Sequence, residues 1–134
     1  MKEASLFFSQ DNFTSHLLQT LKNLLNEKEF TDVTLVGDDN IQLTAHKVIL
    51  SAFSPILRNL LLSNPHPHPL FYMRGVTSLE LSSLLKFMYF RETEISQNNF
   101  NTFQVLANDL EVRCLYVPDE SLEDKTPASL LSQN

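Results

Sequence analysis

Histidine and cysteine are among the residue types in this sequence that could bind a metal or take part in catalysis. Two of the four histidines, His66 and His68, lie close together in residues 64–69 with a single proline between them. A structural zinc site needs four ligands, and no nearby cysteine completes one with finger-type spacing. We therefore predict a solvated loop and no metal site, with metal bridging between molecules as an incidental alternative.

No arrangement of residues typical of catalysis is found. Gly37 and Gly75 are the only glycines, which excludes a glycine-rich phosphate-binding loop. Serine, histidine and aspartate are all present, but no nucleophile motif brings them together. We interpret Cys114 as a small half-buried apolar residue and His46 as a hydrogen-bonded structural residue of a packed helix. The chain is predicted not to be an enzyme, and to take no cofactor and no small-molecule substrate.

Length and composition indicate one globular domain of 134 residues, with 43% hydrophobic and 19% charged residues. The net charge of −6, without a lysine or arginine cluster, disfavours direct nucleic-acid binding, because phosphate neutralisation supplies most of that affinity. A single cysteine cannot form an internal disulfide, which fits a reducing compartment. No apolar run reaches the roughly 18 residues of a membrane-spanning helix, and the N-terminus lacks a signal-peptide core, so we expect neither membrane contact nor secretion.

The elements that must position these residues follow from the spacing of apolar side chains. Asp11 or Asn12 can cap a first helix that continues to residues 26–29, with its apolar residues at helical intervals. Residues 30–36 are predicted to form a strand. Residues 37–40 are predicted to form the turn to a returning strand that contains Ile41 and Leu43.

Two short helices are expected next, the first over residues 46–53 and the second capped by Ser54 and started by Pro55. Three prolines within residues 64–69 forbid a helix there, and residues 70–73 are expected to form a third strand. Thr77 and Glu80 have the spacing of a capping box, and they precede the clearest helical pattern in the chain.

The last part of the chain changes character. Residues 92–95 are expected to form a brief strand, and Ser96 to cap a further helix that extends to about residue 110. From Pro118 onwards Asp, Glu, Ser, Lys and Pro dominate and the apolar periodicity is lost. We therefore predict a folded domain over residues 1–117 and a disordered acidic or polar tail or linker over residues 118–134.

Three segments make the overall pattern specific. Phe-Thr-Asp-Val-Thr-Leu-Val occupies residues 30–36, Ala-His-Lys-Val-Ile-Leu-Ser-Ala-Phe-Ser-Pro residues 45–55, and Leu-Lys-Phe-Met-Tyr residues 85–89. These segments resemble the signature of the BTB/POZ family. The resemblance implies an α+β fold, with a small mixed sheet flanked by a cluster of α-helices. The chain is most similar to the arthropod Tramtrack-type group of zinc-finger and other nuclear proteins, although residues 6–12 lack that group's usual Arg-Trp pair.

The resemblance also implies a homodimer. The N-terminal helix would pack against its partner's equivalent, and the preceding strand would cross over to pair with residues 93–95 of the other chain. The dimer interface predicted from these three elements comprises Leu6, Phe7, Phe8, Phe13, Leu17, Leu18, Leu21, Leu24, Leu25, Thr93, Glu94 and Ile95. The alternative is that Phe7 and Phe8 fold onto the core of their own chain.

A charged pocket formed by Asp32 and Lys47 at the dimer interface is a further implication of the resemblance. Two roles remain open for these residues, a structural ion pair or a contact to a partner. Lysine is a point charge on a flexible stem, and is therefore a less specific anion clamp than arginine.

The function implied by the resemblance is protein–protein interaction in a nuclear transcription regulator or chromatin architectural protein. Partners would be a second copy of the chain, other BTB domains, and corepressor or architectural proteins, with any DNA-binding region beyond residue 134. We expect a nuclear location, with a cytoplasmic one as the alternative. Two other functions stay open: a substrate adaptor for a cullin-type ubiquitin ligase, whose usual glutamate is missing from residues 61–67, and a higher-order oligomerisation scaffold.

Overall fold

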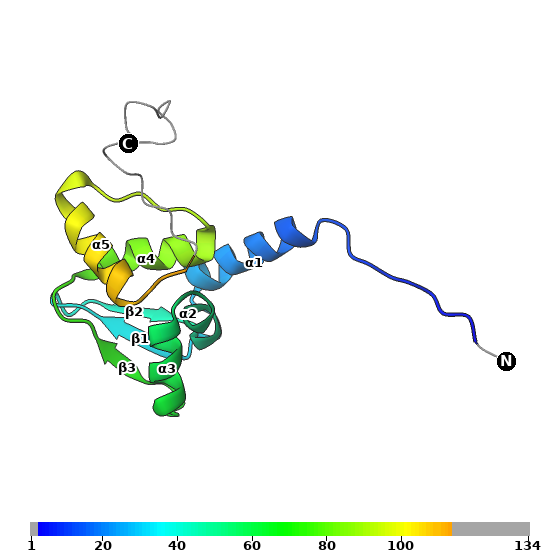
Figure 1. Ribbon diagram of the computed structural model, residues 1–134, viewed down its shortest axis with the longest axis horizontal. Coiled ribbons are helices and arrows are strands. Elements are labelled where there is room, and N and C mark those ends of the chain that lie inside the picture. The colour runs from blue at the N-terminus through cyan, green and yellow to red at the C-terminus, as the bar shows by residue number, and fades with distance from the viewer. Residues whose placement is uncertain (1–2, 114–134) are drawn as a thin grey trace.

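The computed structural model describes residues 3–113, in which a small sheet lies beside α2 and α3 and beneath α4 and α5 in the view of Figure 1. The elements in chain order are α1 (Phe13–Glu27), β1 (Val33–Val36), β2 (Gln42–Ala45), α2 (Lys47–Phe53), α3 (Pro55–Ser63), β3 (Leu70–Tyr72), α4 (Ser78–Phe90), the 3-10 helix η1 (Gln97–Asn99) and α5 (Phe100–Asp109). This order confirms the α+β fold that the sequence predicted.

The sheet is mixed, with its strands in the order β2-β1-β3. β1 pairs antiparallel with β2 through a tight turn and parallel with β3, so the chain crosses over through α2 and α3 between these two pairings. The register brings Val33, Leu35, Leu43, Ala45 and Phe71 to one face, and these residues belong to or pack against the hydrophobic core. The first strand is shorter than predicted, since it begins at residue 33 rather than at residue 30.

Helix α4 lies at the centre of the core. The predicted capping box starts this helix: Thr77 N–H donates to Glu80 Oε1 at 2.8 Å, and the Thr77 side chain accepts from the backbone of the first turn. The apolar residues of the helix are buried at the intervals that the sequence predicted: Leu81, Leu84, Leu85, Met88 and Tyr89. A helix that is buried on most of its surface is expected at the centre of a domain.

Ser54 joins the two helices of the helical hairpin, as predicted, and also ties them to the end of the described chain. Its oxygen accepts the Leu57 N–H at 3.0 Å, which caps α3, and its hydroxyl donates to Leu110 O at 2.6 Å. Arg113 N–H donates to Phe53 O at 2.7 Å. The last described residues are therefore fastened to the C-terminal end of α2.

The turn between β1 and β2 is clasped against the loop that precedes α4. A Cβ atom on Gly37 would lie 2.5 Å from a carbonyl oxygen of that loop, so only glycine fits. Asp38 Oδ1 accepts the Tyr72 hydroxyl at 2.6 Å, and Asp39 Oδ2 accepts the Ser78 hydroxyl at 2.8 Å and its N–H at 3.0 Å. These two bonds from Ser78, with that of its hydroxyl the larger, lower the pKa of the Asp39 carboxyl.

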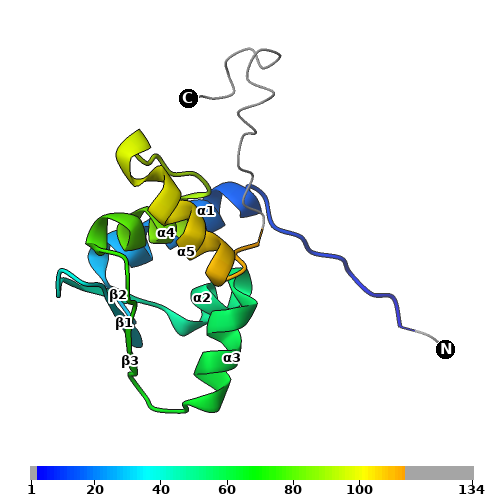
Figure 2. The ribbon, with the colours of Figure 1, turned by 60° about the vertical axis from the view of Figure 1, so that its left-hand side comes forward.

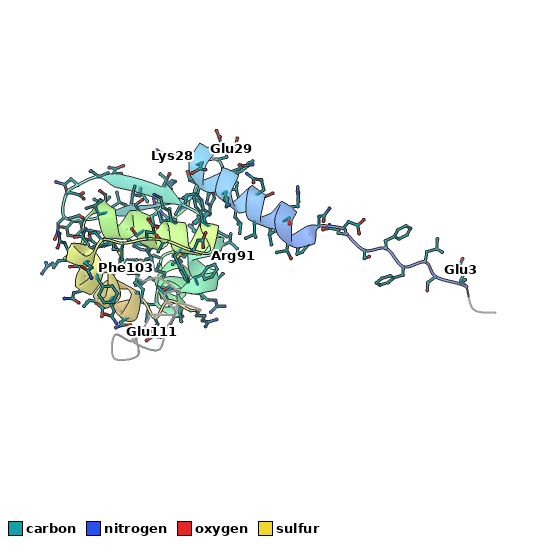
Figure 3. All side chains as sticks on the ribbon, turned by 90° about the horizontal axis from the view of Figure 1, so that it is seen from above. Glu3, Lys28, Glu29, Arg91, Phe103 and Glu111 are labelled. Carbon is teal, nitrogen blue, oxygen red and sulfur yellow. The ribbon has the colours of Figure 1, made fainter. Side chains whose placement is uncertain are left out.

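Helix α1 projects from the rest of the molecule, as Figures 1 and 3 show. Its C-terminal half packs against α4, whereas residues 3–12 are exposed throughout and extend away from the domain. No strand or helix of the described chain covers this N-terminal segment.

Two local predictions are wrong, and a third concerns a strand whose predicted partner belongs to a second chain. Asn12 precedes α1 in a left-handed conformation (φ 57°) without a side-chain cap, because capping requires an extended backbone at that position. Ser96 leads into η1 and likewise makes no side-chain cap. Residues 92–95 are irregular, since no strand of the described chain lies beside them to complete a ladder. Cys114, the boundary at residue 117 and the predicted tail lie outside the described residues.

Candidate protein-interaction surface

The N-terminal segment carries three of the four most exposed large apolar side chains among the described residues. Leu6, Phe7 and Phe8 are 83%, 91% and 84% exposed. The alternative that Phe7 and Phe8 fold onto their own core is therefore not what the structure adopts. Three consecutive exposed apolar residues form the kind of patch that marks an interaction site rather than an ordinary soluble surface.

Helix α1 divides the predicted interface residues into two groups. Phe13 and Leu17, in its N-terminal half, are 54% and 44% exposed. Leu21 and Leu25, in its C-terminal half, pack against the core of their own chain. Leu18 and Leu24 are half-buried. The helix is thus anchored at one end and displays apolar side chains at the other.

The predicted strand partner, residues 93–95, lies far from the N-terminal segment along the chain and is fastened to α4. Ser83 Oγ donates to Glu94 O at 3.3 Å, and Ile95 packs against the core. Thr93 Oγ1 is buried without a hydrogen-bond partner. Within one described chain, this segment and Leu6–Phe8 are not paired with each other, so a single subunit leaves both backbones without a ladder.

Asp32 and Lys47 are brought together, although not through an ion pair. Asp32 Oδ1 accepts the backbone N–H of Lys47 at 2.7 Å, at the first residue of α2. The Lys47 ammonium instead donates to His66 O at 2.7 Å. The predicted structural ion pair is therefore not formed; Asp32 instead accepts a backbone N–H from the first turn of α2, where a carboxylate is favoured by the helix dipole.

His46 is buried in a network that explains its position in the motif. Its Nε2 contacts Glu29 O, and because a carbonyl only accepts, this nitrogen carries the hydrogen. In the neutral ring Nδ1 then accepts the Tyr89 hydroxyl at 2.7 Å, while the Tyr89 oxygen accepts the His46 N–H at 2.9 Å. Burial raises the pKa of Tyr89, so its hydroxyl stays protonated and available as a donor. The structural interpretation of His46 agrees with this network.

The two loop histidines are engaged in local hydrogen bonds. His68 Nε2 lies 2.8 Å from Thr34 Oγ1, and His66 Nδ1 accepts the His68 N–H at 2.9 Å. Over residues 3–113 no three histidine, cysteine, aspartate or glutamate side chains gather as metal ligands would. In the same range, no helix has the length and apolar character to cross a membrane.

Sequence reasoning missed Phe30 as a surface residue. Its side chain is 84% exposed, and its backbone is left-handed with φ 60°, a rare conformation for an aromatic residue. The neighbouring Glu29 carbonyl is held by His46, which keeps this turn in place. The local pattern gave no signal, because an apolar residue before a strand is ordinarily assigned to that strand.

The hydrophobic core, together with the exposed apolar side chains of residues 6–17 outside it, indicates the class of protein: a domain that binds other proteins. The family model described as "BTB/POZ domain" matches residues 21–123. The chain therefore belongs to the BTB/POZ family, whose members are interaction modules rather than enzymes and generally associate with themselves and with partners.

Similar proteins of Drosophila melanogaster place the chain near Tramtrack-type domains. Protein abrupt is 40% identical over 105 residues, which cover 78% of this chain and 12% of that protein. Protein tramtrack, alpha isoform, is 38% identical over 117 residues, or 86% of this chain and 14% of that protein. Longitudinals lacking protein-like is 33% identical over 121 residues, or 90% of this chain and 94% of that protein. The chain thus spans a small part of the first two relatives and nearly all of the third.

Among solved structures, the BTB domain of zebrafish PATZ1 has a TM-score of 0.69 at 19% sequence identity. The match covers 81% of this chain and 89% of that chain. At this identity the similarity shows the fold alone. Figure 2 shows this fold with the sheet facing α2 and α3.

Proposed function

We propose that this BTB domain forms a homodimer and that the dimer serves as an assembly module in a nuclear transcription regulator or chromatin architectural protein. The observation that carries the proposal is the apolar arm, here defined as residues 6–17, which lies outside the core of its own chain. A second copy offers the same surface, and an interface in which both subunits use one patch closes with twofold symmetry.

Helix α1 supports this arrangement through the way its apolar face is divided. The packed residues Leu21 and Leu25 hold the helix rigidly on α4, so Phe13 and Leu17 are presented in a fixed orientation. A rigid, preformed surface binds with a smaller loss of conformational freedom than a mobile one. Because these two side chains are 54% and 44% exposed, covering them between subunits would contribute about half of the roughly 1.5–3 kcal/mol expected for full burial of each.

Strand exchange is the second part of the proposal. Residues 6–8 of one subunit would pair with residues 93–95 of the other, which would satisfy backbone groups that neither segment pairs within its own chain. The buried hydroxyl of Thr93, which has no partner in a single chain, would lie at this junction. Addition of a strand to an open edge is a common mode of protein recognition.

The nuclear role is supported by the resemblance to Tramtrack-type domains and by relatives that extend far beyond this domain. Dimerisation would bring two regions linked to the domain close together and raise their effective concentration at paired sites. Other BTB domains or corepressor and architectural proteins would be the further partners. The charged residues Asp32 and Lys47 would then lie at or near the dimer interface, with the hydrogen bond that Asp32 accepts from the Lys47 N–H unchanged.

Molar mass in solution tests the dimer directly. We expect the unaltered chain to elute at about 31 kDa, twice the chain mass of 15.4 kDa, by size exclusion with light scattering. Leu17→Asp should give the single-chain mass without loss of folded structure, because Leu17 lies outside the core. Leu62→Asp is the matched control on α3, where the leucine is 66% exposed. It should remain dimeric.

A stable single subunit at high protein concentration would contradict the proposal. A mass well above that of a dimer, if it is unaffected by Leu17→Asp, would instead favour the higher-order scaffold. In that case the exposed edge strand β3 would be the next surface to alter.

A further inference from the structure

A shallow groove of about 170 Å³ lies on the domain body, between the C-terminal half of α1, strand β2 and helix α4. Its walls are apolar and come from all three elements: Leu25, Leu43, Leu85 and Phe90. The groove is separate from the apolar arm, since it is formed where α1 is packed rather than where α1 projects (Figure 3).

The rim of this groove is positively charged in a chain whose net charge is −6. Lys28 and Lys86 line the groove, and Lys22 Nζ lies 5.8 Å from the centre of the Phe90 ring on its wall. Three of the six lysines of the chain therefore border one small surface. Arg91, labelled in Figure 3, follows Phe90 directly at the end of α4.

One residue that lines the groove, Thr44, has a buried hydroxyl without a hydrogen-bond partner. Thr44 belongs to β2, an edge strand of the sheet within the described chain.

We propose that the acidic stretch of residues 119–124 of the same chain binds in this groove. Its sequence, Asp-Glu-Ser-Leu-Glu-Asp, places four carboxylates around a single leucine. This composition complements the groove: Leu122 would enter between the apolar walls, and the flanking carboxylates would meet the lysines on the rim. The proposal is independent of dimerisation through the apolar arm.

The place where the described chain ends supports this choice of occupant. Arg113 N–H is bonded to Phe53 O, and the Phe53 ring lies 6.4 Å from the ring of Phe87 on α4, centre to centre. Phe87 is adjacent in sequence to Lys86 and three residues before Phe90, which both line the groove. Eight residues lie between positions 113 and 122, and the nine steps from one Cα atom to the next can span about 30 Å when extended. The acidic stretch can therefore reach the groove without rearrangement of the domain.

Binding of this kind is weak and sensitive to salt, because it combines one apolar side chain with exposed charge pairs. A short linker gives an effective concentration on the order of millimolar, which suffices to populate even a weak contact.

Cross-linking of the full chain tests the proposal. A carbodiimide joins lysine amines directly to carboxylates, and mass spectrometry identifies the linked residues. We expect links from Lys28 or Lys86 to residues 119–124, and their yield should fall about tenfold when the Debye length drops from about 30 Å to about 3 Å at high salt. Lys47, on another surface, is the control and should give no such preference. A mixture of ¹⁵N-labelled and unlabelled protein should show the links within one chain.

Hydrogen exchange on the full chain provides a second measurement. Lys28→Glu combined with Lys86→Glu should speed exchange over residues 82–90 about twofold or more, as expected for loss of a contact of millimolar strength. Adding Asp119→Lys and Glu123→Lys should restore the slower exchange through reversed charge pairs. The proposal would be overturned by cross-links formed equally at Lys47 or by cross-links between chains. It would also be overturned if the rate of hydrogen exchange over residues 82–90 stayed the same in both sets of charge variants.

Discussion

The apolar arm and the body of the domain contain the same types of apolar residue, but the body buries most of them and the arm exposes them. Residues 33–110 cover most of their leucines, phenylalanines and valines around α4, and the polar groups among them are largely hydrogen-bonded. Residues 6–17 carry leucine and phenylalanine just as densely, yet leave them in solvent. The difference teaches that apolar content alone does not locate a core. The C-terminal end of α1 is packed against the domain, while its N-terminal end exposes apolar side chains. This arrangement indicates a surface that another molecule covers.

The largest effect should come from the body of the domain. Leu57 on α3 is fully buried, and Leu57→Ala should lower the free energy of unfolding by about 2–5 kcal/mol through loss of packing and formation of a cavity. Denaturant titration monitored by circular dichroism measures this change. Leu62→Ala on the same helix is the control, since Leu62 is exposed, and should change stability by less than about 0.5 kcal/mol. Equal effects of the two changes would contradict the burial described for α3.

The hydrogen-bond network of the body should give the next effect. Tyr89→Phe removes the hydroxyl that bonds both His46 Nδ1 and the His46 N–H, and leaves these buried groups without a partner. We expect a loss of about 1–3 kcal/mol in the free energy of unfolding. Tyr72→Phe should have a smaller effect, because the Tyr72 hydroxyl bonds Asp38 at an exposed site. Thermal unfolding of the two variants side by side decides the order.

The arm should behave differently from both. Phe7→Ala with Phe8→Ala should leave the folded subunit intact but weaken self-association at least tenfold, a change of about 1.4 kcal/mol. Deletion of residues 1–10 should have the same or a larger effect. Sedimentation over a range of concentrations measures the dissociation constant. An unchanged dissociation constant in both variants would show that the arm is not part of the interface.

The smallest effect on stability should come from the hydrogen bonds between Asp39 in the β1–β2 turn and Ser78, and this effect should depend on pH. The bonds that Ser78 donates lower the pKa of Asp39 below its usual 3.8 in the folded protein. The stabilisation is therefore complete above the unfolded pKa and is lost as the pH falls through the lower folded value. Asp39→Asn should lower the melting temperature slightly at neutral pH and flatten its fall between neutral and acidic pH. Parallel pH profiles for the two proteins would contradict this role.

The elements that the sequence predicted well are those whose signals are local. Thr77 with Glu80, and Ser54 with Pro55, mark helix starts through side chains and backbone groups within one turn, so three or four residues suffice to determine them. The motif at residues 45–55 and the helix from Ser78 were predicted for the same reason, and the family followed from them.

The features that were predicted poorly depend on partners distant in the sequence. Asp32 was paired with the Lys47 side chain, but the fold offered it the backbone amide at the start of α2. Residues 92–95 have strand-like composition but no neighbouring strand in the described chain. Leu21 was grouped with the dimer interface, whereas it is half-buried and packs against the core of its own chain. Leu21→Asp would therefore disrupt the subunit itself, and Leu17 is the better residue for testing the interface.

The sequence by itself determined the family, the order of elements, the capped helix starts and the excess of apolar residues near the N-terminus, because each is written in the spacing of neighbouring residues. Only the tertiary structure decided which of those apolar residues are covered. It placed Leu21 and Leu25 against α4 and left Phe7, Phe8 and Leu17 in solvent. Burial depends on what lies beside a side chain in space. The periodicity of apolar residues along α1 cannot show how far along this helix the contact with α4 extends.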